Sequence, residues 1–406
     1  MSKRKKNKKW TSRRHRILKN IAAALFWPYI VLKYGVKVEK FKEEGNRAYL
    51  VLFNHQTAFD QFFVGMSFSR AVYFLATEDI FSNGFLSSLL RWAVAPISIK
   101  KQMTDVGAVM NCFKVAKEGG TVALAPEGNR TYGGKTAYIN PAIAGLVKKL
   151  QLPVALYRIE GGYGVQPRWS DVVRKGKMRA YVANVIEPEE YENLSTEEVL
   201  DLIRNGLYVD EGVADGKFYS NHRAEYLERA IYVCPTCGLS EFKSSGNYME
   251  CKRCHKKLEY GIDKKFRAVE GDFPFEFTTE WYEYQTQFIN NLDTLQYVDT
   301  PMYTETATVS DVILNKTKVL ICKNASVSLY GDRIVINENA VDEMELAFAD
   351  VSAVSVLGRN KLNIYYGSKV YQLRAGKRFN ALKYVNVFYR YKHIKNGDEN
   401  ATYLGI

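Results

Sequence analysis

The chain has 406 residues, 47% of them hydrophobic and 25% charged, which is the balance of an ordinary globular protein with two or three domains. The formal charge is +13, but ten Lys or Arg and no acidic residue lie in residues 1–20, so the rest carries only +3, which argues against an extended nucleic-acid surface. Six cysteines, four of them in two tight pairs, do not form the disulfide framework of a small secreted protein and indicate a reducing compartment.

An apolar run follows the basic tail. Residues 21–32 are twelve apolar positions that include Trp27, Pro28 and Tyr29. A helix of this length measures about 18 Å, against about 30 Å for the hydrocarbon core of a bilayer, so the run cannot span a membrane alone. We expect residues 1–35 to lie at an anionic membrane surface, with the aromatic rings at headgroup depth. The alternative is a solvated tail that precedes an ordinary core helix.

The next region alternates short apolar runs with amphipathic stretches. Near-continuous apolar runs are typical of strands buried on both faces of a mostly parallel sheet. The stretches 105–117 and 141–150 have apolar residues at helical spacing, and residues 196–230 are also expected to be helical. The pattern predicts an α/β domain. The expected strands are 48–53, 72–76, 94–99, 121–125, 154–157 and 178–185.

A histidine and an aspartate follow the first of these strands. His55 lies two residues past the run 48–53, and Asp60 comes five residues later, where a helix is expected to begin. Functional groups in open α/β sheets gather at the carboxyl ends of the strands. A carboxylate at this spacing can hold the imidazole in one tautomer and leave its other nitrogen free to take a proton from an alcohol. The alternative is that His55 only caps or packs against the helix start.

A second polar motif, residues 125–130, follows the strand expected over 121–125. Gly128 permits close approach of the backbone to a ligand, and Arg130 offers two parallel donors to a phosphate. Glu127 can orient that arginine or bind hydroxyl groups of a substrate. The alternative is a turn with a surface ion pair. Both motifs are expected at the same edge of the sheet.

These two motifs resemble the signature blocks of the 1-acylglycerol-3-phosphate O-acyltransferase family, His-x4-Asp and Pro-Glu-Gly-Thr-Arg. Residues 95–100 stand where the family has an apolar strand that ends in Arg, and residues 152–156 where it has a proline-valine strand. The resemblance covers roughly residues 45–190. It implies a membrane-associated lysophospholipid acyltransferase that takes its acyl group from acyl-CoA or acyl carrier protein.

The resemblance also implies roles for individual residues. His55 is the general base and Asp60 its orienting partner. Lysophosphatidic acid is the type of acceptor implied, with its phosphate held by lysine and arginine side chains. The family's Thr is Asn here and its strand-ending Arg is a Lys, which keeps the charge but loses the planar fork. The residues implied in acceptor binding are Lys100, Glu127, Gly128, Asn129 and Arg130.

Two Cys-x2-Cys pairs lie beyond the acyltransferase-like region. Cys234 and Cys237 are separated from Cys251 and Cys254 by thirteen residues. Four thiolates at this spacing are typical of a zinc ribbon, a closed structural site with no open coordination position for catalysis. Several Lys and Arg residues make the ribbon basic, so it either recognises an acidic partner or serves only as a spacer.

Beyond residue 300 the apolar residues recur at every second position. Residues 361–366 alternate apolar and polar side chains, and a helix is expected over 379–394. Short strands closed by one helix resemble a pleckstrin-homology-like domain. A β-barrel that only packs on the enzyme is the alternative. The other expected strands are 317–322, 325–330, 333–337, 344–348, 352–357 and 369–374.

The sequence thus predicts an acyltransferase on the cytoplasmic face of a membrane. The alternative function is a catalytically inactive module that binds lipid or nucleic acid through the basic tail and the ribbon. The expected regions are a basic tail and interface segment (1–35), an acyltransferase domain (36–230), a zinc ribbon (231–262) and a linker with a β-rich domain (263–406).

Overall fold

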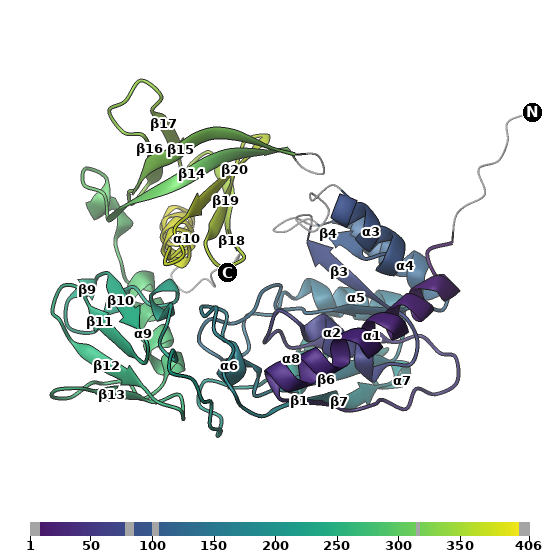
Figure 1. Ribbon diagram of the computed structural model, residues 1–406. Helices are drawn as coiled ribbons and strands as arrows, with labels where there is room; N and C mark the ends of the chain where they lie inside the picture. The colour runs from purple at the N-terminus through teal and green to yellow at the C-terminus, as the bar shows by residue number, and fades with distance from the viewer. Residues whose placement is uncertain (1–8, 78–84, 100–104, 314–316, 398–406) are drawn as a thin grey trace, which may run out of the picture. The chain divides into compact units, whose positions relative to one another are not determined.

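The computed structural model describes residues 9–77, 85–99, 105–313 and 317–397 (Figure 1). The chain divides into two compact units. The first unit comprises residues 1–128, 139–161 and 177–209, and the second comprises residues 129–138, 162–176 and 210–406.

A seven-stranded sheet forms the centre of the first unit, in the order β1-β7-β6-β2-β5-β3-β4. Every neighbouring pair is parallel except β6 and β7. The predicted α/β fold with a mostly parallel sheet is therefore confirmed. The strands are β1 (Val36–Val38), β2 (Leu50–Phe53), β3 (Val72–Thr77), β4 (Ile97–Ile99), β5 (Thr121–Leu124), β6 (Val154–Glu160) and β7 (Met178–Ile186).

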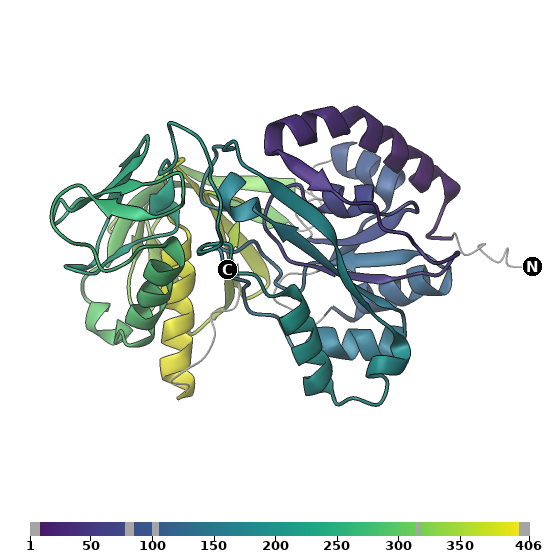
Figure 2. The ribbon, with the colours of Figure 1, turned by 90° about the horizontal axis from the view of Figure 1, so that it is seen from below.

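Helices cover both faces of this sheet. Residues of α4, α5 and α8 share one hydrophobic core with Leu52, Val122 and Leu156 of the central strands. Figure 2 shows α1, in purple, on one side of the sheet and α8, in teal, on the other. The helices are α1 (Arg13–Tyr34), α2 (Asp60–Ser67), α3 (Phe85–Val94), α4 (Val106–Lys117), α5 (Ala142–Leu150), α7 (Pro188–Tyr191) and α8 (Thr196–Leu207).

Local sequence signals explain where these helices begin and end. The side chain of Asp105 accepts a hydrogen bond from the backbone of Ala108 at the start of α4, and Ser195 forms a capping box with Glu198 at the start of α8.

The predicted helix over 196–230 is wrong beyond Leu207. The apolar helical periodicity stops there, and the following residues form turns with only a short 3-10 helix, η2 (Leu227–Arg229).

Helix α1 extends further in both directions than the apolar run 21–32. It begins after the N-cap Ser12 and ends at Gly35, whose φ of 62° is the left-handed conformation that glycine adopts without strain. It is tied to the unit by Lys19, which donates to the carbonyl of Phe68, and by His15, which lies 3.1 Å from the Tyr73 hydroxyl. Among the described residues, no helix combines the length and the apolar character needed to cross a bilayer.

The second unit contains the cysteine-rich region and the β-rich region. A short hairpin, β8 (Val233–Cys234) with β9 (Gly238–Leu239), precedes a four-stranded antiparallel sheet. Helix α9 (Thr278–Asn290) packs next to this hairpin, and the indole N–H of Trp281 donates to the carbonyl of Val233 in β8. The unit also holds α6 (Gly162–Val165) and η3 (Thr294–Tyr297). The four strands are β10 (Phe242–Ser245), β11 (Tyr248–Cys251), β12 (Lys257–Tyr260) and β13 (Phe266–Ala268).

A seven-stranded antiparallel sheet follows, in the order β17-β16-β15-β14-β20-β19-β18, and α10 (Leu382–Asn396) packs on it. The predicted β-rich region closed by a helix is confirmed. One long strand, β15, replaces the two strands expected over 317–330. The strands are β14 (Tyr303–Ile313), β15 (Thr317–Leu329), β16 (Arg333–Ile336), β17 (Met344–Ala347), β18 (Val351–Leu357), β19 (Lys361–Tyr366) and β20 (Lys369–Ala375).

Candidate active site

The loop that carries the histidine begins where β2 ends. Asn54 comes directly after β2, and its side-chain amide donates to the carbonyl of Ile159 at 2.9 Å and accepts from the same residue's N–H at 2.7 Å. These two hydrogen bonds continue the pairing between β2 and β6 just past the end of β2, with a side chain in place of the backbone. Asn54 is fully buried, so it anchors the loop to the rigid centre of the sheet.

His55 and Asp60 meet as the sequence predicts. The His55 Nδ1 lies 2.7 Å from the Asp60 Oδ2, and Asp60 is the first residue of α2. The Asp60 side chain is 0% exposed and the His55 side chain 25% exposed. The carboxylate is therefore shielded from water, while the imidazole remains open to a substrate.

The loop is folded around the Asp60 carboxylate. The backbone N–H groups of Gln56 and Thr57 donate to it at 2.7 to 3.0 Å, and the Thr57 hydroxyl donates to Oδ1 at 2.7 Å. Because a carboxylate only accepts hydrogen bonds, the His55 Nδ1 carries its proton toward Asp60. The His55 Nε2 is then the nitrogen with the free lone pair, which is the state that a general base needs.

Glu127 connects the second motif to the first. Strands β2 and β5 are parallel neighbours, so the loops at their carboxyl ends meet at the same edge. The backbone N–H of His55 donates to the Glu127 Oε1 at 2.8 Å. The structure thus shows Glu127 holding the backbone of the histidine. Its predicted contact with the acceptor stays a prediction.

Gly128 closes the turn after β5. Its N–H donates to the carbonyl of Ala125 at 3.1 Å, and its φ is 72°. A Cβ atom here would meet nothing within 4 Å, so the backbone conformation, rather than a lack of space, favours glycine.

Three more residues, Lys100, Asn129 and Arg130, were predicted to bind the acceptor. Asn129 and Arg130 begin the part of the second unit that covers residues 129–138, where the Arg130 carbonyl accepts a hydrogen bond from Arg168 Nη1 at 2.9 Å. Lys100 lies outside the described residues. The roles of Lys100, Asn129 and Arg130 therefore stay predictions.

The sequence patterns did not single out Asn54 and Thr57, although both position the loop that carries His55. Each is fully buried. The side chain of Asn54 bonds the backbone of Ile159, and the hydroxyl of Thr57 bonds the Asp60 carboxylate. The available signal was local: a hydroxyl three residues before an acidic helix start is typical of side-chain bonding at helix N-termini. Nothing in the sequence indicated that Asn54 pairs with Ile159, because that contact joins residues 105 positions apart.

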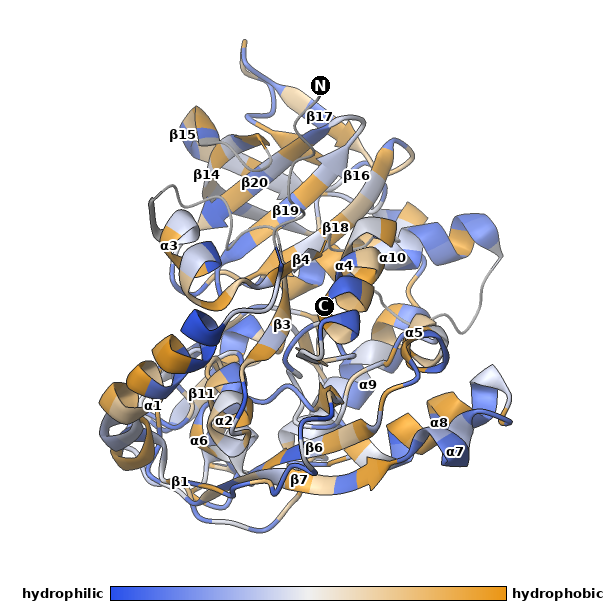
Figure 3. Ribbon diagram, turned by 90° about the vertical axis from the view of Figure 1, so that its right-hand side faces the viewer, coloured by the Kyte–Doolittle hydropathy of each residue, from blue (hydrophilic) through white to orange (hydrophobic). Residues whose placement is uncertain are grey.

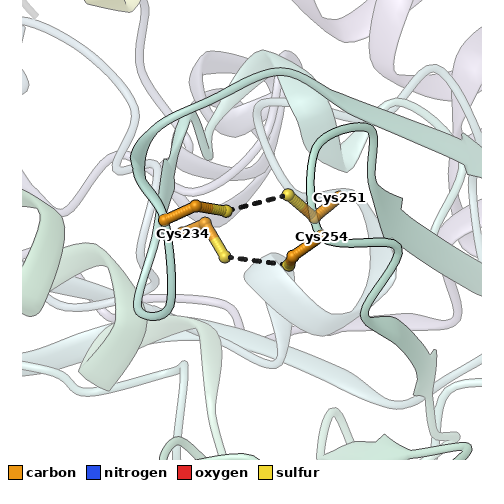
Figure 4. A group of neighbouring side chains, drawn as sticks. Cys234, Cys251 and Cys254 are labelled. Carbon is orange, nitrogen blue, oxygen red and sulfur yellow. Dashed lines mark hydrogen bonds between the residues drawn. The ribbon is translucent and has the colours of Figure 1, made fainter.

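The four predicted cysteine ligands come together in the second unit (Figure 4). Their Sγ atoms all lie within 4.8 Å of one another, with Cys234 at 3.7 Å from Cys254 and Cys237 at 3.6 Å from Cys251. Sulfurs at the corners of a tetrahedron with metal–sulfur bonds of about 2.3 Å are about 3.8 Å apart. The four thiols can therefore hold one metal ion.

Most basic side chains of the ribbon already have partners. Lys243 pairs with Glu250 at 3.1 Å, and Lys252 pairs with Glu241 at 2.9 Å. Arg253 donates to the backbone carbonyl of Cys237, and Lys256 donates to the backbone carbonyl of Glu270.

Comparison with known proteins places the histidine loop in a family. Residues 35–158 match the Acyltransferase family, and this range contains all four sequence blocks, so the predicted relation to acyltransferases is confirmed. The 1-acyl-sn-glycerophosphate (LPA) acyltransferase PlsC from Thermotoga maritima is similar in structure, with 18% identity, a TM-score of 0.36, and coverage of 47% of this chain and 92% of that one. A comparison with curated protein sequences finds no match.

Proposed function

Since residues 35–158 form an acyltransferase-family domain, we propose that the protein transfers a fatty acyl group from an acyl thioester to the hydroxyl of a lysophospholipid such as lysophosphatidic acid. The observation that carries this proposal is the pair of His55 and Asp60: a partly exposed imidazole whose Nδ1 is held by a fully buried carboxylate at the edge of the sheet.

The reaction is a direct displacement without an acyl-enzyme. The His55 Nε2 takes the proton of the acceptor hydroxyl as its oxygen attacks the thioester carbonyl carbon. The resulting tetrahedral intermediate expels the thiolate when the carbon–sulfur bond breaks, and His55 returns the proton to that sulfur. Asp60 stabilises the imidazolium between these two steps. The donor is acyl-CoA or an acyl carrier protein thioester.

The acceptor phosphate is assigned to Lys100 and Arg130, with Gly128 and Asn129 in the intervening turn. Arg130 comes two residues after Gly128, and two residues of extended chain span at most about 7 Å. Chain connectivity therefore keeps the backbone of Arg130 close to the turn that carries Glu127, whichever way its side chain points.

Membrane association is assigned to α1 and the basic tail before it. Ile17, Ile21, Leu25, Tyr29 and Leu32 are all exposed and recur at intervals of four and three residues, with Leu25 at 72% and Leu32 at 85% exposure. Residues at this spacing share one helix face. Figure 3 shows α1 with a long apolar stretch, in orange. Such a face suits a helix that lies in the interface of an anionic leaflet on the cytoplasmic side.

Zinc is the metal proposed for the four cysteines, in a structural role. Four sulfur ligands complete a tetrahedral zinc site and leave no position for a substrate. The alternative function is a catalytically inactive module that binds lipid or nucleic acid through the basic tail and the ribbon. The ribbon's part in it is disfavoured because Lys243, Lys252, Arg253 and Lys256 contact carboxylates or carbonyl groups.

The experiment that tests the proposal is an acyl-transfer assay with labelled acyl thioester and a panel of lysophospholipid acceptors. We expect His55→Ala to abolish transfer and Asp60→Asn to lower kcat by about 10²- to 10⁴-fold, because the asparagine no longer holds the imidazole as a carboxylate does. Both variants should still bind anionic vesicles. Turnover by His55→Ala at the wild-type rate would remove His55 from the mechanism.

A further inference from the structure

The distal half of the β14–β15 hairpin has a strand neighbour on only one side of β15. The two strands pair from Tyr303 and Leu329 to Ile313 and Thr317. Strand β16 pairs only with residues 327–329 of β15, and β20 pairs with residues 307–311 of β14. Among the described residues, the outer edge of β15 over residues 317–322 therefore has no strand beside it.

A bulge separates this distal half from the rest of the sheet. The register between the two strands shifts twice, between Ala307 and Val309, opposite Lys323 and Asn324, and between Val309 and Ser310, opposite Ile321. Asn324 has a φ of 56°, a left-handed conformation that asparagine tolerates better than most residues. Bulges bend a strand and re-aim the residues beyond it.

Three consecutive apolar residues are exposed at and beyond the second register shift. Val319, Leu320 and Ile321 are each 47% to 49% exposed, and Ile313 on β14 is also exposed. Leu320 stands opposite Ser310 and Val319 opposite Asp311, so these two apolar side chains point to opposite faces of the sheet. Figure 3 shows the apolar segments of β15 in orange. Soluble proteins usually protect such an edge with charges, prolines or a covering element.

The distribution of these side chains favours a lipid surface as their partner. A protein strand added to the free edge would leave both faces exposed, and a packed sheet or helix would cover only one face. A bilayer interface can receive apolar groups from both faces of this free edge at once. Lys318 and Lys323 flank the apolar residues and are exposed, which suits anionic headgroups.

Polar and charged side chains also lie beside this segment. Lys318 donates to the Gln372 side chain at 2.9 Å, and Asp311 stands opposite Val319 in the register of the two strands. The free N–H and C=O groups on the outer edge of β15 still need water, since unpaired backbone groups are costly in hydrocarbon. Insertion must therefore stop at headgroup depth.

We propose that the outer edge of β15 over residues 318–321, with Ile313 beside it, inserts shallowly into the headgroup region of an anionic bilayer. It gives the second unit a membrane contact of its own, independent of α1. The inference rests on the second unit alone and does not depend on the acyltransferase chemistry, so His55→Ala should leave it unchanged.

The test compares two triple variants of the full chain in vesicle sedimentation, with vesicles of phosphatidylcholine and phosphatidylglycerol. Val319→Ser, Leu320→Ser and Ile321→Ser together should lower the partition coefficient by about tenfold or more, since three aliphatic side chains lose their burial. The matched control replaces three exposed apolar residues elsewhere in the second unit, Val269→Ser, Leu295→Ser and Val341→Ser, and should bind like the wild type.

Hydrogen exchange of peptides over residues 317–323 supplies a local readout in the wild-type chain. We expect vesicles to slow hydrogen exchange of these peptides both in the wild-type chain and in the Leu25→Gln variant. Equal partitioning of the two triple variants would overturn the proposal. Protection that appears without vesicles and grows with protein concentration would also overturn it, because a second copy would then cover the hairpin.

Discussion

At the scale of single residues, Asp60 organises the loop that carries His55. Its buried carboxylate receives hydrogen bonds from His55, Gln56 and Thr57, three consecutive residues that the chain bends back toward it. An amide in its place would turn one N–H group toward these donors. The aspartate therefore sets both the tautomer of the imidazole and the shape of the loop, and no neutral residue of the same size does both.

Glu127 binds the backbone of His55 rather than its imidazole, and we propose that it positions this residue. Glu127→Ala removes the acceptor of the His55 N–H, and we expect kcat to fall by about 10- to 100-fold, because the imidazole is no longer held in place. Glu127→Gln keeps an oxygen that can accept this bond and should retain most of the activity. A steady-state kinetic comparison decides the matter: equal losses in the two variants would indicate that the negative charge, rather than the hydrogen bond, is what matters.

Lys264 makes stability depend on pH in the second unit. Burial lowers the pKa of this lysine from 10.5 to about 8, with nearby carboxylates opposing the shift. Its amine donates to the carbonyls of Glu211 and Ala214. Between pH 8 and 10.5 the unfolded chain binds a proton that the folded chain lacks, so stability should rise with pH by an amount on the order of 1–3 kcal/mol. Below pH 8 both states are protonated, and this contribution is constant.

Denaturant unfolding of the wild type and Lys264→Met across pH 7 to 10.5 measures the effect. The difference in unfolding free energy should shift in favour of the wild type as pH rises. The tyrosines titrate in both proteins and cancel in the comparison. A difference that stays flat over this range would contradict the assignment.

At the scale of elements, α1 has two faces with different tasks. One face is held against the first unit by Lys19 and His15, and Ile30 and Tyr34 are buried near its end. The opposite face is apolar and exposed. The helix is therefore fixed by its polar contacts while its exposed apolar face remains available to a membrane.

We expect Leu25→Gln with Leu32→Gln to weaken binding to anionic vesicles by about tenfold, because two exposed leucines no longer enter the interface. Asn20→Gln, an exposed polar position on the same helix, serves as the control and should bind normally. Vesicle sedimentation gives both values. Binding of the leucine variant at wild-type strength would assign the membrane contact to another part of the chain.

At the scale of the whole molecule, the cysteine region and the C-terminal sheet share one hydrophobic core. Val233, Met249 and Leu258 of the cysteine region share one hydrophobic core with Leu329 and Leu382 of the β-rich region. The core of the first unit, in contrast, contains no residue from the cysteine region. Loss of the metal should therefore affect the second unit and spare the first.

Elemental analysis should find about one zinc per chain. Removal of this metal with a chelator should speed hydrogen exchange in strands β10–β13 and also in strands β14–β20. Exchange in β2, β5 and β6 should stay slow. Cys234→Ser should reproduce the effect without chelator, whereas Cys322→Ser, outside the cluster, should keep its metal. A chelated protein with unchanged exchange throughout the second unit would show that the site does not stabilise the fold.

The sequence by itself determined the features that depend on local pattern. Apolar runs predicted the buried parallel strands, the spacing of His55 and Asp60 predicted their contact, and the two Cys-x2-Cys pairs predicted the cluster of four sulfurs. Each of these signals lies within a short stretch of chain or in a spacing with few geometric solutions, so it can be read without knowing the rest of the fold.

Only the tertiary structure decided the contacts between distant segments. The pairing of Asn54 with Ile159, the bond from His55 to Glu127 and the exposure of Val319 to Ile321 on a free strand edge depend on which strands become neighbours. A sequence specifies that a residue is polar or apolar, but its partner is set by sheet order and register. Those are properties of the whole chain, because they follow from how all its strands are buried together.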